Sequence, residues 1–229
     1  MLEPSTILLA ALTGLISGLL LSMPIGPVNL SIINEGACHG FVRGMLVGLG
    51  ASVMELIYCT IAFTGFSSFF GDRVVKASME VFSFAFLLFL GAKFLVAKTV
   101  SAPTQLGAAA GRLEARVGEK LHPHSAFMTG FVRVLGNLGV LLFWIVLAAN
   151  FMSHDWVADT LIAKTACVAG VAVGTNLWFC VLSYGVSRGH GRFSESTLVR
   201  MQHFSGFCLL AVGLFDGGHI VWQLAEHKI

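Results

Sequence analysis

Two prolines, Pro24 and Pro27, interrupt the first long apolar segment of the chain. Each proline lacks a backbone N–H and clashes with the preceding helical turn, so a helix that begins near Ile7 cannot run regularly through residues 23–29. In a bilayer, an opened backbone is tolerated only where it faces protein or a water-filled cavity. Interrupted helices of this kind often build the substrate sites of transporters. The segment therefore predicts a broken membrane helix with a site at its break.

The composition indicates an integral membrane protein. Only 11% of the 229 residues are charged, whereas soluble domains carry about 25%. The net charge of +2 is too small to indicate a nucleic-acid partner. The first apolar segment has no basic n-region and no small-residue cleavage site, so we interpret it as a retained span rather than a signal peptide.

Six apolar segments approach or exceed the length of about 20 residues that a spanning helix needs. We therefore predict an all-α membrane protein with six transmembrane helices and a single transporter domain over residues 1–229. The first helix is expected to be broken at Pro24 and Pro27. The predicted spans cover residues 7–33, 41–65, 77–97, 126–150, 161–186 and 202–222.

The basic residues predict the orientation of these spans. If successive connections lie on alternate sides, ten Lys and Arg residues fall on one side and four on the other. Basic residues concentrate on the cytoplasmic side of bacterial membranes, so the polar linker at 98–124 is predicted to be cytoplasmic and both termini periplasmic. The richer side holds Arg43, Lys93, Lys98, Arg112, Arg116, Lys120, Arg133, Arg188, Arg192 and Arg200, and the poorer side Arg73, Lys76, Lys164 and Lys228.

The two halves of the chain resemble each other. Residues Phe82–Phe94 are similar to Phe204–Asp216 at an offset of 122, and the same offset places Gly48 on Gly170. With three spans in each half, the copies would insert in opposite orientations. We therefore predict two inverted three-helix repeats, at about 1–97 and 125–229, with the solute site at their interface.

The stretch PIGPVNLSIINEGACHGFVRG, which begins at Pro24, resembles the first-helix signature of the LysE/RhtB amino-acid exporter family. Similar features follow along most of the chain, namely an acidic residue in span two, an asparagine in span four, a tryptophan in span five and a late glycine in span six. They are Glu55, Asn137, Trp178 and Gly213. Family members usually have Pro after the span-four asparagine, whereas this chain has Leu138, so the sequence leaves open whether span four is also broken.

The resemblance implies six transmembrane helices and export of small solutes driven by an ion gradient. It does not identify the solute, because the wider superfamily also contains divalent-metal exporters.

Glu55 is the only acidic residue well inside spans one to five. An ionisable group at that depth costs a few kcal/mol on insertion scales, so it is usually kept for function and faces the bundle interior. We expect Glu55 to couple protons or to bind a substrate ammonium. The alternative is a structural carboxyl that is hydrogen-bonded to a neighbouring helix.

Several other polar residues are candidates for binding the solute. The amides of Asn29 and Asn137 could bind a zwitterion, although Asn29 could instead cap the helix that restarts after Pro27. Asn176 could bind the solute or bridge helices. Arg133, one turn before Asn137, could hold a carboxylate or extend to the lipid headgroups. The predicted substrate-binding residues are Pro24, Gly26, Pro27, Asn29, Glu55, Arg133, Asn137 and Asn176.

Two further groups of residues complete the set of candidates. Asp216 shares a face with His219 near the outer end of span six and could serve as a second proton-coupling residue, or both could simply be solvated. His122 and His124 in the linker are too few for a closed metal site, so no metal or cofactor is predicted.

Four glycines recur at every fourth residue after the break, a spacing that predicts a bare ridge on one helix where a neighbour packs closely. They are Gly36, Gly40, Gly44 and Gly48. Gly14 lies on a stretch that we expect to be less constrained.

The chain is thus predicted to be a bacterial inner-membrane secondary transporter, not an enzyme, that exports an amino acid or similar small metabolite, by proton antiport. A divalent-cation exporter is the alternative transporter, although one membrane carboxylate supplies few hard ligands. The alternative of another class is a non-transporting scaffold, for which the prolines and Glu55 would be unnecessary. Expected partners are the solute, protons or another coupling ion, and the lipid bilayer, and the candidate assembly is a homodimer.

Overall fold

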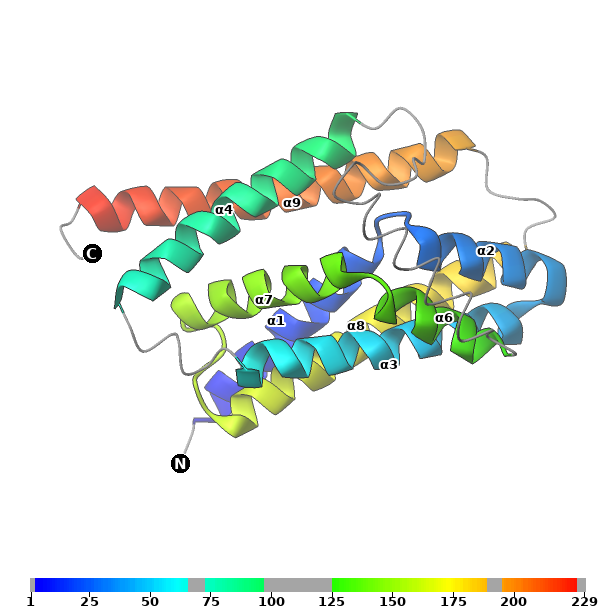
Figure 1. Ribbon diagram of the computed structural model, residues 1–229, viewed down its shortest axis with the longest axis horizontal. Helices are drawn as coiled ribbons and strands as arrows, with labels where there is room; N and C mark the ends of the chain where they lie inside the picture. Colours follow the sequence, from blue (N-terminus) through cyan, green and yellow to red (C-terminus); the bar gives the residue numbers. More distant parts are fainter. Residues whose placement is uncertain (1–2, 66–72, 97–124, 189–194, 226–229) are drawn as a thin grey trace.

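The protein is built from α-helices. The computed structural model describes residues 3–65, 73–96, 125–188 and 195–225, and within these ranges it contains helices and no strands. This confirms the predicted all-α class. The helices in Figure 1 are α1 (Pro4–Ser22), α2 (Pro27–His39), α3 (Phe41–Gly65), α4 (Arg73–Val96), α6 (Ala126–Leu135), α7 (Leu138–Ser153), α8 (Leu161–Arg188) and α9 (Glu195–Ala225).

Successive segments of the chain run in alternating directions between the two ends of the bundle (Figure 1). Helices α1 and α2 run one way, α3 returns and α4 runs back, and the same alternation follows in α6 with α7, α8 and α9. The start of α1 and the end of α9 therefore lie at the same end of the bundle.

Three helices, α1, α3 and α8, are each long and apolar enough to cross a membrane, and α6 with α7 is a bent pair that passes the same test as one span. Helices α4 and α9 contain shorter apolar stretches, Phe84–Val96 and Gln202–Phe215. The chain is therefore a multi-pass membrane protein by the length and composition of its helices, and six spans stay a prediction.

Close backbone contacts hold α1 against α8. A Cβ atom added to Gly14 would overlap the carbonyl oxygen of Cys167, and one added to Gly18 would lie 2.6 Å from the carbonyl oxygen of Val171. From the other side, Gly170 and Gly174 approach the backbone of α1 in the same way. The expectation that Gly14 is less constrained is therefore wrong, because its close partner lies in a segment far away in the sequence.

The same kind of contact joins α3 to α6 and α4 to α9. A Cβ atom on Gly50 would overlap the Phe127 carbonyl oxygen, and one on Gly130 would overlap that of Val47. A Cβ atom on Gly206 would lie 2.8 Å from the carbonyl oxygen of Gly91. Small residues let helix backbones approach closely in membranes, so these contacts define three tightly packed helix pairs.

The predicted glycine ridge is divided by a turn. Helix α2 ends at His39 and α3 begins at Phe41, and Gly40 between them has φ 84°, a conformation that favours glycine. Gly36 and Gly44 therefore face each other across the α2–α3 turn, where a Cβ atom on Gly44 would lie 3.2 Å from the Gly36 Cα. The expected continuous ridge on one helix is not present, and only Gly44 and Gly48 belong to α3.

Candidate functional site

The first helix break lies between Ser22, the last residue of α1, and Pro27, the first residue of α2. Asn29 closes it: its side-chain Nδ2 donates to the carbonyl oxygens of Ser22 at 2.8 Å and Pro24 at 2.7 Å. The helix restart is capped by Gly26, which contributes no side chain. Asn29 thus satisfies the open end of α1 rather than the start of α2, and Pro27 occupies the first helical position, where its missing N–H costs nothing.

The second break lies between α6 and α7, whose segments Ala126–Leu135 and Gly139–Ser153 differ in direction by 67°. Asn137 caps α7, because its Oδ1 accepts from the Gly139 backbone N–H at 3.1 Å. The Tyr58 hydroxyl on α3 donates to the Leu135 carbonyl oxygen at 2.8 Å. The helix is therefore interrupted between α6 and α7 in spite of Leu138, since a capping side chain can start a helix without proline.

Glu55 lies on α3 where α1, α3 and α8 meet. Its side chain is half-buried, and Thr175 Oγ1 on α8 lies 3.4 Å from Glu55 Oε2 and 3.5 Å from the Gly18 carbonyl oxygen on α1. One turn earlier on α3, the Ser52 hydroxyl accepts from Asn176 Nδ2 at 2.8 Å. These contacts form a polar cluster of Ser52, Glu55, Thr175 and Asn176 between α3 and α8.

Asn176 retains unused hydrogen-bonding capacity in this cluster. Its Nδ2 donates to Ser52 and to the Ala172 carbonyl oxygen, both at 2.8 Å. Its Oδ1 is buried and accepts no hydrogen bond from the described part of the chain. An amide oxygen in this state is available to a donor on a solute.

Helix α8 also connects the polar cluster with the first break. Trp178 Nε1 donates to Asn29 Oδ1 at 3.3 Å. Asn29 already uses both N–H groups of Nδ2 at Ser22 and Pro24, so only the second lone pair of its Oδ1 is left for a donor on a solute. Direct binding of a solute by Asn29 stays a prediction.

The remaining predicted residues lie elsewhere. Arg133 is half-buried in the last turn of α6, two residues before Leu135 at the second break. Asp216 and His219 belong to α9, but their side chains lie outside those that the structure describes, as do His122 and His124 with the whole linker. No group of three or more potential metal ligands occurs among the described residues.

Sequence reasoning missed Ser52, Tyr58 and Thr175. Ser52 and Tyr58 could have been noticed, because they lie three residues before and after Glu55 and so share its side of α3. Thr175 gave no such signal, since its contact with Glu55 depends on the register between two helices that are distant in sequence.

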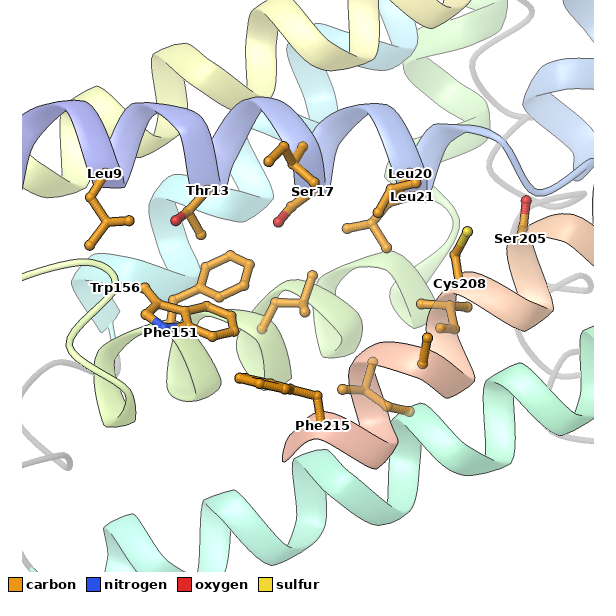
Figure 2. A pocket seen from close by; sticks show the side chains of 15 residues that line it. Leu9, Thr13, Ser17, Leu20, Leu21, Phe151, Trp156, Ser205, Cys208 and Phe215 are labelled. Carbon is orange, nitrogen blue, oxygen red and sulfur yellow. The ribbon is translucent and has the colours of Figure 1, made fainter. Parts of the chain in front are cut away.

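An apolar cavity of about 490 Å³ lies on another side of α1, between that helix, α7 and α9 (Figure 2). Thr13 and Ser17 of α1 point into it opposite Phe151, Trp156 and Phe215. The residues that line it include neither Glu55 nor its hydrogen-bond partner Thr175. Helix α1 therefore lies between the cavity and the polar cluster.

Comparison with known proteins decides the family. The sequence model of the LysE type translocator family matches residues 19–215, a range that includes both breaks and the whole polar cluster. The chain belongs to the LysE type translocator family. The family consists of transporters rather than enzymes, so the chain is a membrane translocator, and the resemblance of its first-helix motif is confirmed.

A curated relative from Bacillus subtilis (strain 168) carries the name "Putative amino acid efflux protein YcgF". It is 26% identical over 213 residues, which cover 93% of this chain and 97% of the relative. The similarity therefore extends over essentially the full length of this translocator relative. No solved structure matches the chain.

Proposed function

We propose that this LysE type translocator exports an amino acid or a similar small zwitterion by proton antiport, with Glu55 as the proton-carrying group. The observation that carries the proposal is the position of Glu55, which meets Thr175 where α3 and α8 adjoin α1, close to the first break. A carboxyl group in a membrane helix is costly unless it has a function. The similarity to an amino acid efflux protein supports the choice of solute.

The first break suits a solute with one positive and one negative group. The carboxyl end of α1 carries carbonyl groups without intrahelical partners and a partial negative charge, which attracts an ammonium. The amino end of α2 carries free N–H groups and a partial positive charge, which attracts a carboxylate. Only four residues, 23–26, separate the two ends at Ser22 and Pro27, so one small zwitterion could contact both.

Two features of the fold support an inverted repeat. Applying the offset of 122 to the start of α1 at Pro4 leads to Ala126, where α6 begins, and applying it to Arg73 of α4 leads to Glu195, where α9 begins. The first helix of each half also packs on the long helix of the other half, α1 on α8 and α6 on α3. Such repeats commonly alternate between outward-open and inward-open states by rocking against each other.

The orientation completes the proposal. The end of the bundle that holds Arg43, Arg188 and Arg200 would face the cytoplasm of a bacterial inner membrane, and both termini would face the periplasm. A homodimer is the assembly that we propose to test alongside transport.

The test is transport by the purified protein in proteoliposomes, with a panel of radiolabelled amino acids and an imposed pH gradient. We expect at least one amino acid to accumulate against its gradient and a protonophore to abolish the accumulation. A second arm offers divalent metal ions under the same conditions. Transport of metal ions alone, or an amino-acid flux that does not depend on the pH gradient, would contradict the proposal.

A further inference from the structure

We propose that Thr175 is the positioning residue that transmits the protonation state of Glu55 to the first helix break. Its hydroxyl proton would switch between an acceptor on α3, Glu55, and an acceptor on α1, the Gly18 carbonyl oxygen. The proposal rests on the proposed proton-coupling function of Glu55.

The geometry around Thr175 offers one donor to two acceptors. Its Oγ1 lies 3.4 Å from Glu55 Oε2 and 3.5 Å from the Gly18 carbonyl oxygen. Hydroxyl donors usually approach their acceptors to about 2.7–2.8 Å, and a hydroxyl has a single proton to donate. The two long distances are those of a hydroxyl that lies between alternative acceptors, and a small rotation or shift favours one of them.

The charge of Glu55 selects the acceptor. When Glu55 is ionised, it is acceptor-only and negatively charged, so it draws the Thr175 proton more strongly than a neutral carbonyl does. When Glu55 takes up a proton, its own O–H can donate to Thr175 Oγ1, and the Thr175 proton turns to Gly18. One proton is gained at the carboxyl group, and the other change is a rotation of the Thr175 hydroxyl.

The Gly18 carbonyl oxygen is hydrogen-bonded to Ser22, the residue at which α1 ends and the break begins. It accepts from the Ser22 hydroxyl at 2.6 Å, and helix geometry directs the Ser22 N–H toward it. A carbonyl oxygen has two lone pairs, so a bond from Thr175 competes with the bond from the Ser22 hydroxyl. Ser22 is the last residue of α1, and its carbonyl oxygen is held by Asn29. A change in the protonation of Glu55 therefore alters the hydrogen bonds of Ser22, which Asn29 holds at the break.

The same switch changes how two helix pairs are joined. Thr175 belongs to α8, which is packed tightly on α1, whereas Glu55 belongs to α3, which is packed tightly on α6. A bond from Thr175 to Glu55 joins the two pairs, and a bond to Gly18 stays within one pair. Ionised Glu55 thus holds the pairs together by a charge-assisted bond, and protonation replaces it by a neutral bond of roughly half the strength. Protonation therefore weakens the link between the pairs, which is what a proton-gated rocking motion requires.

Other titratable or charged groups lie on the helices around α3, so the test must separate their effects from those of Glu55. They include Glu35 and His39 of α2, which pair with each other at 3.1 Å, and Arg133 of α6. On α8 they include Lys164, Cys167, Cys180, Tyr184 and Arg188.

The experiment compares Thr175→Val, which keeps the shape but loses the hydroxyl, with Thr175→Ser, which keeps the hydroxyl. Thr165→Val is the matched control, because Thr165 is an exposed threonine of α8 whose hydroxyl, among the described residues, bonds only to the Leu161 and Ile162 carbonyl oxygens of its own helix. Proteoliposomes report two quantities for each protein: amino-acid accumulation driven by a pH gradient, and exchange at equal pH and equal concentration.

We expect Thr175→Val to lower gradient-driven accumulation about tenfold, the size expected for losing one hydrogen bond to a charged group, while exchange survives. Thr175→Ser and Thr165→Val should behave like the wild type. In a Glu55→Gln background, adding Thr175→Val should cause no further loss of coupling, because the two residues act in series. If the valine variant does not insert, Thr175→Ala is measured in its place.

Wild-type coupling in Thr175→Val, or equal loss of coupling in the valine and serine variants, would overturn the role of Thr175. Wild-type coupling in Thr175→Val, together with loss of coupling in Glu55→Gln, would leave the proposed function intact. Wild-type coupling in Glu55→Gln would instead overturn both the proton-carrying role of Glu55 and this inference.

Discussion

Trp178 and Asn29 join α8 to α2 beside the first helix break, where the indole Nε1 donates to the amide Oδ1 at 3.3 Å. The same amide donates both of its N–H bonds to the carbonyl oxygens of Ser22 and Pro24. One side chain that is only 3% exposed therefore connects both sides of the break and a third helix. The break is a fixed structure rather than a loose loop.

Replacing Asn29 by Ala should destabilise the protein, because it leaves two carbonyl oxygens and one indole N–H without their partner. Each buried polar group that loses its partner costs roughly 1–3 kcal/mol, so we expect a clearly lower melting temperature in detergent. Asn34→Ala is the control, since Asn34 lies exposed on the same helix. Equal melting temperatures for both variants would show that the amide does not hold the break.

Gly14→Ala should reduce the yield of folded protein, because the added methyl group would overlap the carbonyl oxygen of Cys167. Backbone cannot move away as a side-chain tip can, so α1 and α8 would have to separate. Gly65→Ala is the matched control, since a Cβ atom there would meet no atom of the described residues within 4 Å. Size-exclusion profiles and thermal stability compare the two. An unaffected Gly14→Ala protein would contradict the close α1–α8 contact.

Proline in place of Leu138 should be tolerated. Leu138 is the first residue of α7, where the backbone N–H needs no intrahelical partner and proline is favoured. Asn137 before it has φ −99° and ψ 82°, outside the α region that a following proline disfavours. Leu141→Pro, one turn later inside the helix, should unfold or strongly destabilise the protein, at a cost of about 3 kcal/mol or more. Similar stability of the two variants, measured by thermal unfolding, would place the start of α7 elsewhere.

The sequence predicted the features that depend on the covalent nature of single residues. Pro24 and Pro27 cannot continue a helix in any surroundings, so the first break followed from their positions. The second break could not be predicted, because Asn137 caps α7 only when the chain presents the Gly139 N–H to it. The apolar lengths of the segments likewise predicted the helices but not which helices pack together.

Features that depend on packing between segments far apart in the chain could not be predicted from the sequence. The tight contact at Gly14 is made by Cys167, and the hydrogen bond at Glu55 is made by Thr175. Neither partner can be found without the register between α8 and its neighbours. The four-residue glycine period was misleading for a related reason, because a turn at Gly40 is compatible with the same spacing as a continuous helix.

The central claim is that Glu55 carries the proton that drives export, and the variant Glu55→Gln tests it most directly. Glutamine keeps the size and the ability to accept from Thr175 but cannot ionise, and membrane insertion should be unharmed because a potentially charged group is removed. The measurement is amino-acid uptake into everted vesicles, with and without a protonophore, at matched levels of wild-type and variant protein. We predict that gradient-driven uptake collapses in Glu55→Gln to the level of the wild type with protonophore. Uptake at the wild-type level, still sensitive to the protonophore, would contradict the claim.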